Sequence, residues 1–228
     1  MATVGYGDIH PATPVGKVLA IVLIVTGVGT FLGVIGNATE IMLNRREKEQ
    51  RCQKLNMVQG LFFGELGTDL IAMFAAFDPN INALREKLVV TGEWSRHHFA
   101  SISSTLNAHD FKVDPEGMDF IEVREFLARH KSFLLRLLEN PALLGNESFT
   151  ELLRATFHLN AELVSRKDLS TLPPSDKGHL AGDAKRVYAL LVHHWLTYME
   201  HLKVHYPCLF SHAMRTNPFD TEATPVVT

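Results

Sequence analysis

The apolar residues of this chain are concentrated near its start. Residues 18–39, bracketed by Lys17 and Glu40, form an uncharged stretch of 22 residues. As a helix rising ~1.5 Å per residue it would be about 33 Å long, which is enough to cross a hydrocarbon core of roughly 30 Å. Buried core helices and signal-peptide segments typically have only about 7–15 apolar residues. The pattern therefore predicts a transmembrane helix within residues 11–44.

Charges on either side of this helix predict its orientation. One basic residue, Lys17, precedes the apolar stretch, and five follow it closely: Arg45, Arg46, Lys48, Arg51 and Lys54. Basic residues are enriched on the cytoplasmic side of membrane spans. We therefore expect one span of the plasma (inner) membrane, with the N-terminus outside. A charged helical linker at residues 45–58 would lead into a cytoplasmic domain.

From residue 59 onward the apolar positions recur at helical spacing. The spacing predicts helices at residues 67–77, 81–90, 93–107, 115–139, 152–164 and 176–206. A capping box of Ser148 and Glu151 precedes the fifth of these helices. We find neither a convincing alternating strand nor an internal repeat. We predict an all-α fold, with the transmembrane helix followed by a cytoplasmic bundle of about six helices at residues 59–215 and a disordered tail at residues 216–228.

A glycine-containing motif at residues 1–10 stands directly before the predicted span. Its residues are Thr3, Val4, Gly5, Tyr6, Gly7 and Asp8. A dehydrated potassium ion needs a cage of oxygen atoms, which backbone carbonyls can supply if all of them point inward. Such a backbone visits conformations that only glycine adopts cheaply, so glycine is expected at alternate positions.

This motif, with the apolar helix after it, resembles the selectivity filter and inner helix of prokaryotic potassium channels. The resemblance covers about the first fifty residues. It implies that the carbonyls of residues 3–6 and the Thr3 hydroxyl line the ion sites. It also implies that Tyr6 braces the filter and that Asp8 lies at the outer mouth. Potassium would be the permeant ion, no cofactor would be needed, and four copies would form the pore as a homotetramer in the lipid bilayer.

Glycines are numerous within the predicted span, at Gly27, Gly29, Gly33 and Gly36. Glycine permits close helix approach or bending, because it has no Cβ. One interpretation is a helix-dimer contact through Gly29 and Gly33. The other follows from the resemblance, because Gly27 falls where the family commonly has a gating hinge. Glu40 either concentrates cations at the inner mouth or is a solvated residue at the end of the span.

The resemblance also raises an expectation about completeness. A subunit of this family carries an outer helix and a pore helix before its filter, whereas Met1 lies two residues ahead of Thr3. We expect the sequence to be the end of a longer chain or a truncated product that does not conduct by itself.

The remaining chemistry of the sequence is sparse. The net charge of −3 predicts no attraction to nucleic acid, and the two cysteines form no metal or disulfide motif. On the last predicted helix, His194, His201 and His205 share one face and are candidate metal ligands, or else they pack at a helix seam. His158 and Glu162 are spaced for a structural hydrogen bond.

No catalytic signature is present, so we expect no enzyme. The sequence favours a potassium-selective channel subunit whose helical domain serves assembly or gating, with a cytoplasmic ligand that it does not identify. The alternative is a single-pass membrane anchor that carries a cytoplasmic helical binding module able to hold a metal.

Overall fold

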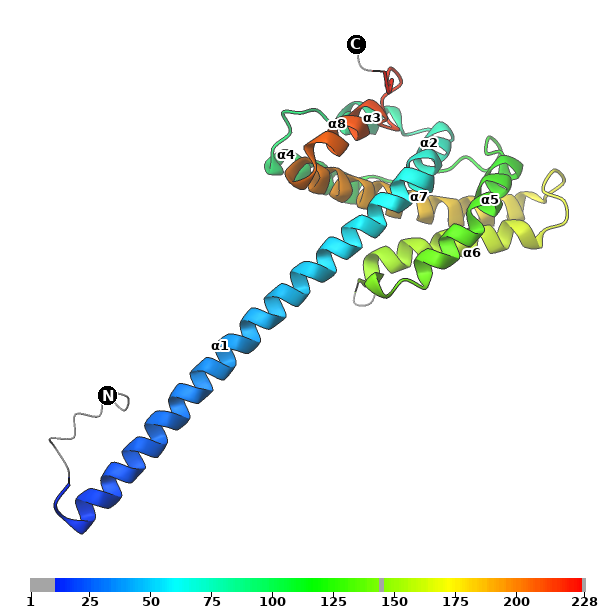
Figure 1. The fold of residues 1–228 in the computed structure, drawn as a ribbon. Coiled ribbons are helices and arrows are strands. Elements are labelled where there is room, and N and C mark those ends of the chain that lie inside the picture. The colour runs from blue at the N-terminus through cyan, green and yellow to red at the C-terminus, as the bar shows by residue number, and fades with distance from the viewer. Residues whose placement is uncertain (1–10, 144–145, 227–228) are drawn as a thin grey trace. The chain divides into compact units, whose positions relative to one another are not determined.

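The computed structural model describes residues 11–143 and 146–226. All regular structure in these residues is helical, which confirms the predicted all-α class. Figure 1 shows the order of the helices along the chain. The chain divides into two compact units, Met1–Gln53 and Lys54–Thr228, each of which is described by itself.

The first unit contains most of helix α1, which extends from Pro14 to Phe62. The Thr13 hydroxyl accepts a hydrogen bond of 3.2 Å from the backbone N–H of Gly16, which satisfies one of the free donors at the start of the helix. Among the described residues, one helix is long and apolar enough to cross a membrane, and its apolar part belongs to this unit. The large apolar side chains of that part are exposed within the structure. These side chains therefore form an apolar surface that is suited to contact with lipid or with other subunits.

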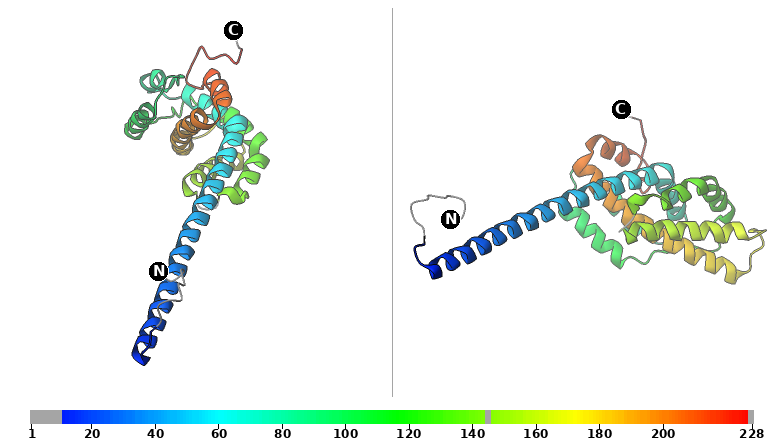
Figure 2. Two further views of the ribbon diagram at one scale, coloured as in Figure 1. Left: turned by 60° about the vertical axis from the view of Figure 1, so that its left-hand side comes forward. Right: turned by 60° about the horizontal axis from the view of Figure 1, so that its bottom comes forward.

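The second unit is a helical domain built around one long helix. Its elements after α1 are η1 (Phe63–Gly67), α2 (Thr68–Ala76), α3 (Asn82–Leu88), α4 (Arg96–Ala108), α5 (Phe120–Leu138), η2 (Pro141–Leu143), α6 (Glu147–Ser165), α7 (Pro174–His205) and α8 (Pro207–Arg215). Helix α7 contacts α2, α4, α6 and α8, while α5 packs against α6. Figure 2 shows α5, α6 and α7 side by side. Helix α7 thus organises the domain.

Two helices begin at capping residues other than those predicted. Helix α5 starts at Phe120, because the Asp119 carboxylate accepts hydrogen bonds from the backbone N–H groups of Ile121 and Glu122. The prediction of a start at Pro115 was therefore wrong. Helix α6 starts at Glu147, where the Asn146 side chain caps the N–H of Phe149 at 2.9 Å. Asparagine thus fills the capping role that the sequence assigned to Ser148.

Aromatic side chains fill the centre of the helical domain. The rings of Phe62 and Phe149 meet edge to face at 5.5 Å, and Phe63 stacks on Tyr198 at 5.2 Å. Both phenylalanines near the end of α1 are almost fully buried. They therefore join the end of α1 to α6 and α7 through apolar contact.

A single π-helical turn, η1, lies between α1 and α2. A Cβ atom on Gly67 in this turn would lie 2.6 Å from the Phe63 ring and 2.8 Å from the Phe62 ring. The hydroxyl of Thr68 donates to the Phe63 carbonyl at 2.8 Å. Glycine at position 67 therefore lets the two rings pack against the backbone of the π-helical turn. The Thr68 hydrogen bond adds a second contact across this turn, which is wider than an α-helical one.

The first part of the predicted disordered tail, residues 216–219, is packed against the domain. Phe219 is 1% exposed and meets Trp195 edge to face at 5.2 Å. Asn217 is also buried. The prediction of disorder is therefore corrected for residues 217 and 219, because the buried Phe219 ring and the buried Asn217 side chain contact the domain.

Candidate functional site

The predicted ion-binding residues Thr3, Val4, Gly5, Tyr6 and Gly7, with Asp8 at the outer mouth, lie outside the described residues. The structure therefore describes the predicted pore from residue 11 onward.

The predicted hinge, Gly27, lies inside α1 among threonines that bond to their own helix. The Thr26 hydroxyl donates to the Val22 carbonyl at 2.8 Å. The Thr30 hydroxyl donates to the carbonyls of Thr26 and Gly27, at 2.7 and 3.0 Å. Threonines that donate back along a helix tend to bend it, and glycine weakens it. Glu40, predicted for the inner mouth, is exposed on the same helix.

The three histidines predicted to share a face of α7 have separate partners. His194 Nε2 lies 3.1 Å from the Ser148 hydroxyl, and burial lowers the pKa of this imidazole below its usual value. His201 Nδ1 lies 3.2 Å from the Asn56 side-chain amide, with its ring 4.6 Å from that of His205. His201 and His205 thus lie together, whereas His194 serves a different contact.

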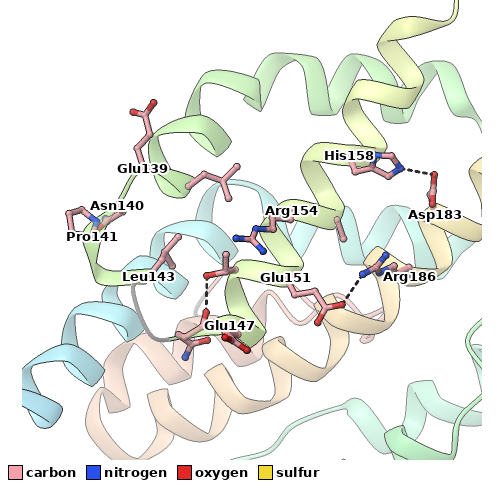
Figure 3. A pocket seen from close by; sticks show the side chains of 14 residues that line it. Glu139, Asn140, Pro141, Leu143, Glu147, Glu151, Arg154, His158, Asp183 and Arg186 are labelled. Carbon is pink, nitrogen blue, oxygen red and sulfur yellow. Dashed lines mark hydrogen bonds and ion pairs between the residues drawn. The ribbon is translucent and has the colours of Figure 1, made fainter.

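Among the cavities of the helical domain, two contain residues considered above. The first, of about 590 Å³, is mainly apolar and lies among the end of α1, η1, α7 and α8, with Tyr198, His201 and Leu209 in its wall. The second, of about 920 Å³, lies among the end of α5, η2, α6 and α7. Figure 3 shows the charged side chains of this second cavity. We call it the α6–α7 cavity.

Charged residues of both helices line the α6–α7 cavity. Arg186 of α7 donates to Glu151 of α6 at 2.9 Å. Farther along the two helices, His158 Nε2 lies 3.7 Å from an oxygen of Asp183. Figure 3 shows His158 and Asp183 pointing toward each other from adjacent helices. The cavity is therefore lined by both signs of charge.

Beyond the cavity the charged residues continue as a network. Arg166 donates to both oxygens of Asp176, at 2.6 and 2.7 Å, and to Glu162 at 2.8 Å. These hydrogen bonds lower the pKa of both carboxyl groups. His179 lies 3.8 Å from Glu162 and 3.6 Å from Asp183.

The sequence predicted a hydrogen bond between His158 and Glu162, which is not formed because His158 Nε2 and Glu162 Oε1 are 4.0 Å apart, although the two side chains do lie together. It missed the second pair, His179 and Asp183, which has the same four-residue spacing on α7. The repeated spacing on two helices was the available signal. Among the described residues, no group of three or more His, Cys, Asp or Glu side chains is already arranged to hold a metal ion.

Two family descriptions match different parts of this chain. Residues 51–215 match the family described as the C-terminal helical domain of the uncharacterized protein MJ1433. Residues 1–44 match the family described as ion channel. The two matches together identify an ion-channel pore region followed by an MJ1433-like helical domain.

Two relatives are similar to this chain. The chain is 45% identical over 184 residues to the uncharacterized protein MJ1433 of Methanocaldococcus jannaschii, covering 81% of this chain and 74% of that protein. It is 46% identical over 39 residues to a voltage-gated potassium channel of Aeropyrum pernix, covering 17% of this chain and 13% of that protein. No solved structure matches the chain.

Proposed function

We propose that this chain, which belongs to the family of the MJ1433 C-terminal helical domain, is a subunit of a potassium-selective channel. In this proposal the helical domain assembles or gates the pore and has no enzymatic role. Support comes from the match of residues 1–44 to the ion channel family and from the similarity to a potassium channel. The apolar, membrane-length part of α1 agrees with both.

Selectivity would come from the filter motif. Stacked carbonyls from Thr3 to Tyr6 would replace the water around a potassium ion, and Gly5 and Gly7 would permit the backbone conformations that this requires. One copy supplies only a quarter of such a ring. We therefore include a homotetramer, spanning the lipid bilayer, with potassium as the permeant ion and no cofactor.

Gating would act on α1. The segment around Gly27 combines glycine with threonines that donate back along the helix, and both features favour bending there. Glu40, at the end of the apolar stretch, would raise the local cation concentration at the inner mouth. A ligand of the helical domain could shift the pore only through a difference in affinity between the closed and open states.

The observation that carries the proposal is the filter motif immediately before an apolar helix, inside a segment that matches the ion channel family. The test is a chimera in which residues 1–44 replace the matched segment of the Aeropyrum potassium channel. We expect currents in planar bilayers whose reversal potential follows the potassium gradient rather than the sodium gradient.

The matched control is the same chimera with Gly5→Ala. Alanine disfavours the backbone conformations proposed for the filter, so this variant should lose potassium selectivity or current. A parent chimera that conducts sodium as well as potassium in the bilayer would contradict the proposal, as would a Gly5→Ala variant with unchanged selectivity.

A further inference from the structure

Two helices of the domain each present a histidine and a carboxylate, four residues apart, to the other helix. Helix α6 carries His158 and Glu162, and α7 carries His179 and Asp183. Residues four apart lie on one face of a helix. The helices are antiparallel here, because His158 faces Asp183 while Glu162 faces His179. Two imidazoles and two carboxylates therefore gather at one seam.

The separations within this group, which we call the histidine–carboxylate cluster, are nearly uniform. The Asp183 Oδ2 atom lies 3.7 Å from His158 Nε2 and 3.6 Å from His179 Nε2. Glu162 places one oxygen 4.0 Å from His158 Nε2 and the other 3.8 Å from His179 Nε2. Both carboxylates thus stand at similar distances from both imidazoles.

These distances do not fit hydrogen bonds. Charge-assisted N–H···O contacts are about 2.7–2.9 Å long. The Asp183 Oδ2 atom is buried and has no hydrogen-bond partner among the described residues. A buried carboxylate oxygen without a hydrogen-bond partner is costly, and a cation bound between the imidazoles and the carboxylates would satisfy it.

We propose that α6 and α7 together bind one divalent transition-metal ion of the zinc class. The ligands are His158, Glu162, His179 and Asp183. Imidazole nitrogen and carboxylate oxygen suit zinc, and neutral imidazoles with two carboxylates give the ligand set a charge that offsets the ion. The site goes beyond the pore function and does not depend on it.

The ligands must close slightly to bind the ion. Zinc bonds of about 2.0–2.1 Å in a tetrahedron place ligand atoms about 3.4 Å apart. The imidazole nitrogens lie 3.6–4.0 Å from the proposed ligand oxygens, Asp183 Oδ2 and Glu162 Oε1, which is therefore a few tenths of an ångström too long. The side chains of His158 and His179 are 58% and 56% exposed, so both imidazoles can turn toward the carboxylates without disturbing the core.

Arg166 fixes the orientation of one proposed ligand. Its guanidinium donates to the Glu162 Oε2 atom at 2.8 Å and to the Glu162 carbonyl at 2.6 Å. The same guanidinium is shared with Asp176, which offsets part of its charge. The Glu162 Oε1 atom is left for the metal. Hydrogen bonds of this kind commonly hold metal ligands in place.

The α6–α7 cavity supplies access for the ion. His158 and Asp183 form part of its wall, so the cluster can be reached from solvent. Figure 3 shows these two side chains at the cavity with their connecting contact. Because the ligands come from two helices, a bound ion would tie α6 to α7.

The test uses the full chain in detergent with Cys52→Ser and Cys208→Ser, since both free cysteines are exposed and thiolates bind zinc. Zinc binding is measured by titration calorimetry, and cobalt binding by its visible absorption. We expect one site per chain in the cluster, with tetrahedral cobalt bands and a zinc-dependent rise in Tm. The His158→Ala/His179→Ala variant should lose affinity by more than tenfold and lose that rise.

The matched control is His201→Ala/His205→Ala. It removes two histidines of α7 that lie beside each other and outside the cluster, and it should bind zinc as the parent does. A second variant, Asp183→Asn, keeps the shape of the side chain and should also weaken binding, which guards against a folding defect in the histidine variant. Equal affinity in the parent and the His158/His179 variant would overturn the proposal. Loss of binding in the control alone would do so as well.

Discussion

The side-chain amide of Asn217 donates a hydrogen bond of 2.9 Å to the backbone carbonyl of Leu88, 129 residues earlier in the chain. Leu88 is the last residue of α3, where a helix leaves carbonyls without partners. The buried Asn217 side chain thus supplies a hydrogen-bond donor to a carbonyl at the end of α3, although the two residues are far apart in the sequence. Asn217, just after α8, is therefore part of the folded domain.

Removal of the aromatic anchor in this segment should destabilise the helical domain. Phe219 is almost fully buried against Trp195, so Phe219→Ala leaves a cavity and is expected to cost about 3–5 kcal/mol of unfolding free energy. The measurement is tryptophan fluorescence during denaturation of the detergent-solubilised chain. Val226→Ala, at a position 63% exposed, should change stability by less than about 0.5 kcal/mol. Equal effects of the two substitutions would contradict the packing of Phe219.

The π-helical turn offers a test with a built-in control. Gly67→Ala drives a methyl group into the rings of Phe62 and Phe63, and overpacking of this kind typically costs about 1–3 kcal/mol. Gly64→Ala is in the same turn but meets nothing within 4 Å. It should be neutral or slightly stabilising, because alanine reduces the freedom of the unfolded chain. Thermal unfolding should therefore show a lower Tm for Gly67→Ala alone.

His194 should make the domain less stable in mild acid. Burial lowers the pKa of His194 below the usual 6.5, so the unfolded chain takes up this proton first as pH falls. Its contribution is absent well above pH 6.5 and becomes destabilising as pH drops below that value. It levels off once pH passes below the folded-state pKa.

The measurement compares Tm at pH 7.5 and pH 5.5 for the parent and for His194→Gln, whose side chain does not titrate. The substitution should reduce the loss of Tm between the two pH values. His97→Gln, at an exposed position, is the control and should leave that loss unchanged. If Tm depended on pH identically in the parent and in His194→Gln, a lowered pKa of His194 in the folded chain would be contradicted.

The exposed cysteines test the proposed orientation. With the helical domain in the cytoplasm, a membrane-impermeant maleimide should label Cys208 only after spheroplasts are opened. A variant without native cysteines but with Ala12→Cys, ahead of α1, should be labelled in intact spheroplasts. Labelling of Cys208 in intact spheroplasts would reverse the assigned topology.

The sequence predicted the features that depend on local pattern. The uncharged stretch predicted the membrane-length helix, and helical spacing predicted the helix at residues 115–139, whose Phe120, Val123 and Leu127 lie in the core. Features set by tertiary packing could not be predicted in this way. A helix tolerates proline in its first turn, which is why Pro115 was predicted to begin this helix. The Asp119 cap instead fixes the start of α5.

The histidine–carboxylate cluster shows the same limit. Each pair of residues four apart was visible in the sequence, but only the antiparallel register of α6 and α7 brings His158 to Asp183. Phe219 likewise lay in a polar segment whose pattern resembles disorder. Its place beside Trp195 depends on the path of the chain after α8.

The threonines of α1 have a consequence for how this helix can move. Thr26, Thr30 and Thr39 each donate their hydroxyl hydrogen to a carbonyl of the same helix. Each hydroxyl hydrogen bond therefore turns together with the helix that makes it. The apolar part of α1 can rotate about its own axis in lipid without breaking any of these bonds, so a twisting motion carries no hydrogen-bond cost at these three positions.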